Sequence, residues 1–421
     1  MKLVKLTIFE FDEFSNNHPL GSYHQTSNYA INASEEGYDY ELLGLKDDEG
    51  KIVAASLILI KKISFLSKYG YAPKGFLIDY FDKPLLKTFT DELKKYFYKK
   101  NVAFIKINPE ITIGQIDLKN HITTYNANLE IENNLTELKY KKLIDNYRFS
   151  SKIPKYNVII PLKHTKFSNY KKPIRNKINK GIKLGLELIK SDRDGIDILY
   201  NFIKNKKQYP VNHYYNYFNS FNNKNAIDIF LVKINYEQAL INAREIYQKE
   251  IDNNSKITEE VMQRPRNTEL LKRKLDSDNV LNSYKDNIAE LTNYLASNHD
   301  HYIAGAITIK YKNRVNILIS GYDKKYSHYV PNYFLHNALI EYYKNDYDYL
   351  DFNGISGGFT NDNPYKGLDE FKLGFNPIAI ENIGEFDLII NEGLYINLEK
   401  NGILAKEFKR KEKSIKKWYF F

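Results

Sequence analysis

The sequence contains no cysteine, and among its 421 residues there are only one tryptophan and two methionines. Without thiols the chain cannot form a disulfide scaffold, a cysteine nucleophile, a cysteine-ligated zinc finger or an iron–sulfur site. Its chemistry must therefore come from oxygen and nitrogen side chains, and the composition suits a reducing cytoplasm.

Long apolar segments are missing as well. The longest apolar run, residues 52–60, is about half the length that a bilayer span needs. The N-terminal sequence MKLVKLTIFEFDEF alternates apolar and charged residues and then becomes acidic, unlike the basic and then apolar layout of a signal peptide. We therefore expect a soluble cytoplasmic protein.

Positive charge is in excess, because 62 Lys and Arg residues face 52 Asp and Glu residues, which gives a net charge of +10 and a pI of about 9.1. An anionic partner would explain this excess, but so would AT-rich coding, which also enriches Asn, Ile, Tyr and Phe. The hydrophobic share of 43% and the length suffice for two or three domains with cores of their own.

Alternating strand and helix patterns predict a mixed α/β (α+β) fold with two domains. The first domain, residues 1–148, contains predicted strands at 40–45, 51–60 and 102–107 and a helix at 84–99. The second domain, residues 149–235 and 299–400, repeats this order, with strands at 156–161, 186–190, 227–234, 303–311, 314–322 and 349–352 and helices at 172–184, from about 194, and at 332–343.

Residues 236–298 interrupt the second domain and carry no strand pattern. Apolar residues there recur at steps of three and four, as in Tyr284, Ile288 and Leu291, which is typical of a coiled-coil seam. Pro265 lies near the middle, where it would break a continuous helix. The segment is therefore predicted to be an antiparallel coiled-coil hairpin about 40 Å long. Residues 401–421 form a basic tail.

Gly354-Ile355-Ser356-Gly357-Gly358 matches the G-x-S-x-G pattern of hydrolase nucleophile elbows. A triad of that type needs a histidine after the serine, whereas the last histidine of this chain is His336. Residues 360–364 also predict a loop where the elbow needs a helix. We therefore reject a hydrolase and expect the glycines to let backbone approach a ligand or to make a tight turn.

Three segments concentrate the positive charge. The predicted helix at 172–184 presents Lys172, Arg175, Asn179 and Lys183 on neighbouring positions, which suits phosphates but equally suits a solvated helix face. The middle of the predicted hairpin adds Arg264, Arg266, Lys272, Arg273 and Lys274. Residues 406–417 and the following Trp418-Tyr419-Phe420-Phe421 suit anionic lipid headgroups or a plain disordered terminus.

The most unusual stretch combines Asp351-Phe352-Asn353-Gly354 with Tyr365-Lys366-Gly367-Leu368-Asp369-Glu370-Phe371-Lys372-Leu373-Gly374-Phe375. It places glycines, aromatic residues and Lys372 after a predicted strand, where α/β sheets commonly bind ligands. Composition alone leaves open that Lys372 is an ordinary surface lysine.

Five stretches carry a family resemblance: His18-Pro19-Leu20-Gly21-Ser22 with Gln25, residues 175–185, residues 351–359, Phe371-Lys372-Leu373-Gly374-Phe375, and Ile383-Gly384-Glu385-Phe386-Asp387. With the helical insertion, the chain resembles the Fem-type aminoacyltransferases, which build the interpeptide bridge of peptidoglycan from aminoacyl-tRNA. The resemblance implies two GNAT-like (acetyltransferase-like) domains with a coiled-coil arm in the second.

The reaction implied by this resemblance needs little machinery. An amino acid of the Gly, Ala or Ser class arrives as an ester on tRNA, so the enzyme aligns it with an amine and stabilises the tetrahedral oxyanion. No metal or organic cofactor is required. In the family a lysine of the F-K-x-G-F motif is implicated in that stabilisation, and this catalytic role carries over to Lys372. The acceptor amine, on a lipid-linked or nucleotide-linked muropeptide, must first lose a proton, and the sequence does not settle what takes it.

The other site residues follow from the resemblance and from the basic segments. Substrate binding is expected from Arg175, Lys206, Lys207, Asn332, Tyr333, Asp351, Gly354, Tyr365 and Phe371. Contact with tRNA is expected from Lys172, Lys183, Arg264, Arg266, Lys272 and Arg273. We also expect a peripheral contact of the tail with the inner face of the plasma membrane, and an oligomer with itself or with related transferases.

Three positions depart from the family pattern. Asn108 stands where relatives usually carry an aspartate, Ala33 stands at a position that is often basic, and Lys206 and Lys207 are the nearest substitutes for an expected arginine. These changes leave open a loss of nucleotide-linked acceptor recognition, a variant acceptor or a weakened enzyme.

Two other functions also remain open. An acyl-CoA-dependent N-acetyltransferase would share the domain type, although its usual pyrophosphate loop, with a basic residue and paired glycines opening a helix, is not evident. A non-catalytic scaffold would use the arm to assemble active relatives, since coiled coils serve protein and tRNA contacts equally.

Overall fold

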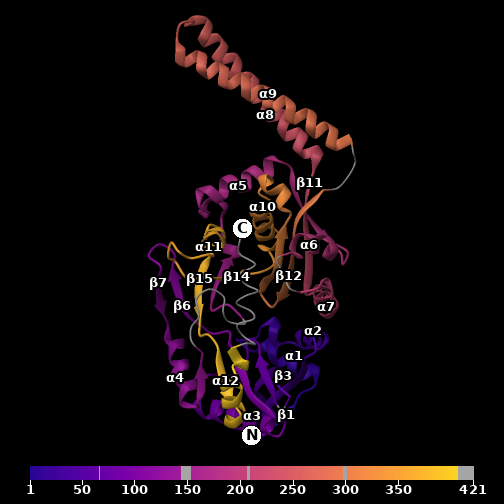
Figure 1. Ribbon diagram of the computed structural model, residues 1–421, viewed down its shortest axis with the longest axis vertical. Coiled ribbons are helices and arrows are strands. Elements are labelled where there is room, and N and C mark those ends of the chain that lie inside the picture. Colours follow the sequence, from indigo (N-terminus) through magenta and orange to yellow (C-terminus); the bar gives the residue numbers. More distant parts are fainter. Residues whose placement is uncertain (66, 144–152, 206–208, 297–300, 406–421) are drawn as a thin grey trace.

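The protein has two mixed sheets, helices on their faces and a two-helix arm, as the α/β patterns of the sequence predict (Figure 1). The computed structural model describes residues 1–65, 67–143, 153–205, 209–296 and 301–405. Lys206, Lys207 and the predicted basic tail lie outside the described residues. No helix in the described part of the chain has an apolar stretch that could span a membrane.

The first sheet has seven strands in the described part of the chain. Their spatial order is β1 (Lys2–Lys5), β2 (Asp39–Lys46), β3 (Ile52–Lys62), β4 (Lys68–Ala72), β5 (Val102–Ile107), β16 (Phe386–Ile389) and β8 (Tyr140–Lys142). β4 and β5 are parallel, and the other neighbouring pairs are antiparallel. The predicted strands at 40–45, 51–60 and 102–107 are confirmed as β2, β3 and β5.

Helix α3 (Lys83–Tyr98) links the parallel strands β4 and β5 and confirms the helix predicted at 84–99. It begins after Asp82, whose carboxylate accepts a hydrogen bond from the backbone N–H of Leu85 at 2.9 Å. Its apolar face is buried against the sheet together with α4 (Glu130–Glu137). The opposite face of the sheet is covered by α1 (Ile8–Asn17), α2 (Ser27–Glu35) and α12 (Glu392–Lys400).

The second sheet has nine strands in the described residues. Their spatial order is β10 (Leu186–Ser191), β11 (Ile227–Ile234), β12 (Tyr302–Tyr311), β13 (Arg314–Tyr322), β14 (Tyr349–Ile355), β9 (Tyr156–Pro161), β15 (Ile378–Asn382), β6 (Thr112–Asp117) and β7 (Ile122–Tyr125). Only β13 and β14 are parallel among these described strands. The six strands predicted between residues 156 and 352 are confirmed.

Helices cover both faces of this sheet as well. One core contains residues of α5 (Lys172–Lys183), α10 (Pro331–Tyr343) and α11 (Lys366–Leu373), and the core on the other face contains residues of α6 (Gly195–Ile203) and α7 (Val211–Asn222). Short 3-10 helices complete the described elements: η1 (Tyr23–Gln25), η2 (Ala127–Leu129), η3 (Leu162–His164), η4 (Phe167–Asn169) and η5 (Lys324–Tyr329).

The two sheets exchange strands, so a boundary at residue 148 does not separate them. β6 and β7 precede that residue but pair within the second sheet, where β6 lies beside β15. β16 comes from the C-terminal part of the chain but pairs with β5 and β8 in the first sheet. Periodicity predicts that a strand exists but not which strand it pairs with, and for this reason the sequence did not indicate the exchange.

The arm consists of α8 (Tyr236–Gln263) and α9 (Thr268–Ala296), which contact one another and project from the body of the molecule (Figure 1). The helices break at the predicted place, where Asn267 accepts hydrogen bonds from the backbone N–H groups of Glu269 and Leu270 and begins α9. The predicted helical hairpin is therefore confirmed. The supercoil of a coiled coil and the acetyltransferase-like character of the domains stay predictions.

Lys106 joins the exchanged strand β16 to β5, and its removal is predicted to destabilise the fold. Its side chain is 1% exposed and lies 3.0 Å from Asp387 and 3.6 Å from Glu385. Lys106→Met would leave the buried carboxylate of Asp387 without this cation, so the free energy of unfolding measured in urea should fall by about 3–5 kcal/mol.

Lys141→Met provides the matched control on β8. Lys141 pairs with Glu399, but its side chain is 41% exposed, so the change should be below about 1 kcal/mol. Equal effects of the two substitutions would show that the buried cation does not hold β16 in place.

Candidate active site between the two sheets

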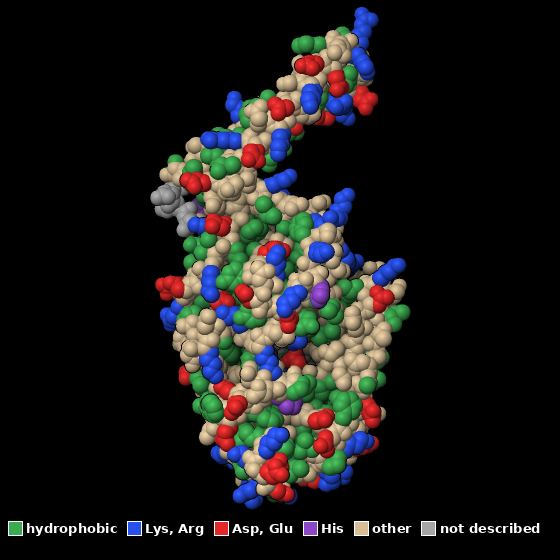
Figure 2. Space-filling model, turned by 180° about the vertical axis from the view of Figure 1, so that it is seen from behind, with side chains coloured by type: hydrophobic (Ala, Val, Ile, Leu, Met, Phe, Trp, Pro, Cys, Tyr) green, Lys and Arg blue, Asp and Glu red, His purple; other side chains and the backbone are tan. Residues whose placement is uncertain are grey.

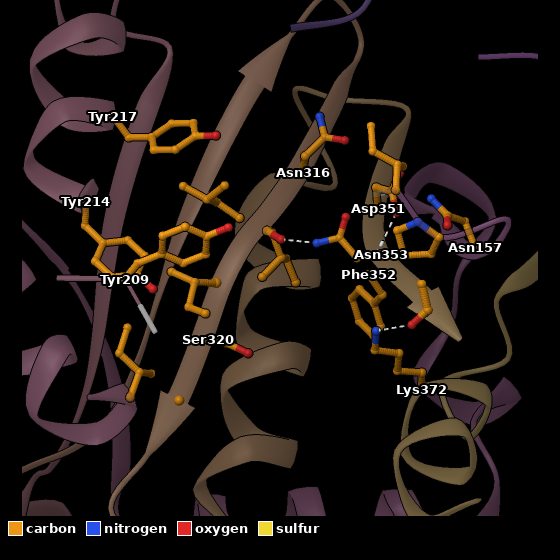
Figure 3. Close-up of a pocket in the computed structure, with 18 of the residues that line it drawn as sticks. Asn157, Tyr209, Tyr214, Tyr217, Asn316, Ser320, Asp351, Phe352, Asn353 and Lys372 are labelled. Atoms are coloured by element: carbon orange, nitrogen blue, oxygen red, sulfur yellow. Dashed lines mark hydrogen bonds between the residues drawn. The ribbon is translucent and has the colours of Figure 1, made fainter. Parts of the chain in front are cut away.

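A cavity of about 780 Å³ lies where the two halves of the molecule meet (Figure 3). Residues from distant parts of the sequence line it. The first half contributes Ser22, Tyr23, His24, Tyr29, Lys74 and Glu110, and the second half contributes Tyr209, Tyr214, Tyr217, β13 residues 316–322, Asn332, Tyr333, His336, Asp351, Phe352, Asn353, Gly354, Phe371 and Lys372. The site therefore requires both halves of the chain.

The cavity exists because the parallel strands β13 and β14 separate. They pair only at residues 314–316 and 349–351, while β13 continues to pair with β12 on its other side. Asn353 follows the split with a left-handed backbone (φ of 63°), and its side-chain amide donates a hydrogen bond to the carbonyl of Ile317 across the gap. The split places the edges of two strands beside the cavity, where ligand groups can meet backbone donors and acceptors.

Lys372 extends from α11 toward β14, where Nζ donates a hydrogen bond of 2.6 Å to the carbonyl of Gly354 (Figure 3). Burial lowers the pKa of Lys372 to about 8, although the nearby carboxyl groups of Asp351 and Asp369 oppose this shift. A cationic N–H donor at a cavity wall is suited to stabilising an oxyanion.

Asp369 supports the glycine segment that faces Lys372. Its carboxylate accepts hydrogen bonds from the backbone N–H of Ser356 at 3.0 Å, from the Ser356 hydroxyl at 2.5 Å and from the Asn363 amide at 2.9 Å. Gly357 has a φ of 71°, and a Cβ there would lie 2.2 Å from the ring of Tyr156. The serine of the G-x-S-x-G pattern is thus a buried structural partner of Asp369.

Four charged groups cross from one half of the molecule to the other along the cavity. Glu110 lies 3.6 Å from Lys74 and 2.8 Å from Arg314, and Arg314 lies 3.9 Å from Asp351. Burial alone would raise the pKa of Glu110, but Lys74 and Arg314 outweigh it and lower that pKa to about 2. Burial raises the pKa of Asp351 against the opposing effect of Arg314.

The other end of the cavity is aromatic. Tyr209, Tyr214 and Tyr217 project from α7 and the segment before it (Figure 3). His213 stacks on Tyr209 with ring centroids 4.2 Å apart and hydrogen bonds to Glu36 from the first half. The cavity therefore has one end with ion pairs and one end with rings that can pack against a sugar or a peptide.

Six of the residues predicted from the sequence come together in this cavity: Lys372, Asp351, Gly354, Phe371, Asn332 and Tyr333. Two others do not line it. Arg175 lies on α5 with its Nε buried and unpartnered within the described residues, and Tyr365 is packed at the start of α11. Contact of these two residues with substrate stays a prediction of the sequence.

The residues predicted to contact tRNA are exposed. Lys172 and Lys183 lie on α5, while Arg264, Arg266, Lys272 and Arg273 lie at the outer end of the arm, where Figure 2 shows basic side chains interspersed with acidic ones. A second cavity of about 560 Å³ separates α5 from the base of the arm, with Lys180, Lys183 and Tyr284 among its lining residues.

Sequence reasoning missed the contributions of Lys74, Glu110 and Arg314. Glu110 follows the Lys106-Ile107-Asn108-Pro109 motif directly, so that motif was the available signal. Asn108 itself is buried, accepts a hydrogen bond from the Lys74 backbone N–H at 2.9 Å and donates one to the Tyr71 hydroxyl at 3.2 Å. The amide thus positions the segment that carries Lys74.

Comparison with known proteins agrees with this arrangement. Residues 6–400 match the model of the FemAB family. The chain is 24% identical over 411 residues to "Aminoacyltransferase FemA" of Staphylococcus epidermidis, covering 94% of this chain and 97% of that protein. It is also 24% identical over 412 residues to FemA of Staphylococcus aureus, with the same shares covered. The crystal structure of FemX superimposes with a TM-score of 0.76 at 20% identity, covering 95% of this chain and 100% of that one. The chain belongs to the FemAB family.

Proposed function

We propose that this protein is a tRNA-dependent aminoacyltransferase that transfers an amino acid of the Gly, Ala or Ser class from aminoacyl-tRNA to an amine of a peptidoglycan precursor. Its curated relatives are named aminoacyltransferases. The observation that carries the proposal is the position of Lys372, whose Nζ reaches β14 at the wall of the cavity opened by the split strands.

The proposed step uses groups that the chain supplies. A neutral amine adds to the carbonyl carbon of the ester, the new C–N bond forms, and the ester C–O bond breaks. The proton that the amine loses ends on the ribose oxygen that leaves. Lys372 in its charged form donates a hydrogen bond to the oxyanion of the tetrahedral intermediate, and the exposed edges of β13 and β14 align the two substrates.

The two chemically different ends of the cavity suggest how the acceptor muropeptide is oriented in it. We assign the end with Lys372 and Asp351 to the reacting amine and the end with Tyr209 and Tyr217 to the more distant part of the muropeptide. Aromatic rings pack well against sugar and peptide surfaces and need no phosphate. This assignment fits Ala33, a buried residue that lines the cavity at a position often basic in relatives.

The donor tRNA is assigned to the basic surface formed by α5, the base of the arm and the arm tip. Lys180 and Lys183 line the second cavity, and neither has an ion-pair partner within the described residues. α5 also contacts the active-site wall, because Lys177 donates a hydrogen bond to the Tyr333 hydroxyl at 2.8 Å. One helix thus links the proposed tRNA surface to the catalytic cavity. Membrane contact through the tail stays a prediction of the sequence.

The first test is transfer itself. Purified protein incubated with charged tRNA and lipid-linked muropeptide should move a labelled amino acid from at least one of glycyl-, alanyl- and seryl-tRNA onto the muropeptide. Acetyl-CoA serves as the rival donor. Absence of transfer with all three tRNAs, or acetylation of the muropeptide in their place, would contradict the proposal.

Lys372→Ala should lower turnover roughly a hundredfold, as loss of one oxyanion donor does. Lys366→Ala on the same helix is the matched control, since its side chain is 51% exposed, and it should leave turnover unchanged. Turnover should rise with pH as the acceptor amine loses its proton. Because the pKa of Lys372 is lowered to about 8, its charge is lost as the pH rises through that value, and the rise in turnover should level off there. Lys372→Arg keeps the charge, so its turnover should continue to rise above that pH. An unaltered rate in Lys372→Ala would reject the role.

Binding of tRNA should weaken as salt is added, and log Kd should rise linearly with the logarithm of the salt concentration, because binding releases counterions. The double variant Lys180→Gln/Lys183→Gln should weaken binding and reduce the slope by about 1 to 2. Lys87→Gln on α3, which removes a lysine paired with Asp91, should change neither value. A salt-independent Kd, or identical slopes for all three proteins, would refute the assigned surface.

A further inference from the structure

His336 is a buried titratable residue at the cavity that the proposed reaction does not use. It lies on α10, is 4% exposed and lines the cavity. Its ring is held by edge-to-face contacts with Phe352 and Phe371, with centroids 5.0 and 4.8 Å apart. Phe371 directly precedes Lys372 in the chain, so His336 is packed into the same wall of the cavity as the catalytic lysine.

The hydrogen bond that His336 makes determines its tautomer. Nδ1 lies 2.8 Å from the backbone carbonyl of Asn332, and a carbonyl can only accept, so Nδ1 carries the proton. Burial lowers the pKa of His336 to about 4, the bond to Asn332 opposes this shift, and the charge of Lys372 adds to it. The ring is therefore neutral at pH 7, and Nε2 carries a lone pair.

Among the residues that the structure describes, none forms a hydrogen bond with Nε2, because the bond to Asn332 uses Nδ1. The nearby carboxylates are already engaged, because Asp351 accepts from the backbone N–H of Asn353 at 2.7 Å and Asp369 accepts from Ser356 and Asn363. Because His336 lines the cavity, a ligand there can supply a donor for this free lone pair.

We propose that Nε2 of His336 accepts a hydrogen bond from the attacking amine of the acceptor substrate and thereby positions it. The inference rests on the proposed function. Lys372 supplies a donor for the oxyanion, and His336 supplies an acceptor for an amine N–H from the same wall. An amine held in this way directs its lone pair at the ester carbonyl. His336 is a positioning residue that does not retain the proton, which ends on the leaving ribose oxygen.

Two substitutions of His336 distinguish the loss of the hydrogen-bond acceptor Nε2 from the loss of ring packing. In His336→Asn the amide N–H₂ takes the place of Nδ1 and can still donate to the Asn332 carbonyl, but nothing replaces Nε2. In His336→Gln the longer side chain brings an acceptor oxygen close to the position of Nε2. Both variants lose the ring, so both should lower the melting temperature to a similar extent.

The transfer assay should then distinguish them. His336→Asn should lower kcat/KM for the muropeptide roughly tenfold to a hundredfold, with the KM for aminoacyl-tRNA unchanged, and His336→Gln should recover most of the loss. Wild-type kcat/KM in His336→Asn would overturn the inference while leaving the proposed function intact. Equal losses of kcat/KM in the two variants would also overturn the inference, because they would show that only the packing of the ring matters.

A measurement that does not need turnover completes the test. In full-length protein labelled with ¹⁵N-histidine, a lysine-bearing stem peptide should shift the Nε2 resonance of His336, and the same peptide with norleucine in place of lysine should not. This result would stand even if wild-type protein showed no transfer. Equal shifts with both peptides, or a shift with adenosine but none with the lysine peptide, would contradict an amine at Nε2.

Discussion

The separation of β13 from β14 is the constraint on which the rest of the site depends. The two strands pair for three residues, and beyond Asn316 and Asp351 they leave room for a ligand between backbone edges. The bond from Asn353 to the Ile317 carbonyl spans the split. Lys372 and the glycine segment approach from the β14 side, and the tyrosines of α7 approach from the β13 side. If β13 and β14 stayed paired along their whole length, these groups would not face one shared cavity.

A second constraint holds the two halves of the chain together around this space. Each sheet incorporates strands from the other half of the sequence, and Lys106 secures β16 through buried carboxylates. Along the cavity, Arg314 at the start of β13 bonds to Glu110 from the first half. The charged groups that shape the site are thus also those that join the halves, which explains why residues with no evident catalytic task are buried there.

Much of this architecture could be predicted from the sequence where the signal is local. The helix at residues 84–99 is predicted by the helical spacing of its apolar residues. The F-K-x-G-F motif is contiguous in the chain, and its Phe371 and Lys372 both line the cavity. The strand exchange and the ion pairs of Glu110 with Lys74 and Arg314 could not be predicted, since strand pairing and ion-pair partners depend on tertiary contacts between distant segments. Tyr365 belongs to a motif but is buried and does not line the cavity, so its predicted contact with substrate stays a prediction.

The central claim is that the aminoacyl ester is held between the split strands beside Lys372. A crystal structure with a stable aminoacyl-adenosine, in which an amide replaces the ester, tests it most directly. The account predicts that the aminoacyl carbonyl oxygen lies within about 3 Å of Lys372 Nζ, in place of the bond to Gly354. An aminoacyl group bound elsewhere, for example in the cavity between α5 and the arm, with Lys372 still bonded to Gly354, would contradict it.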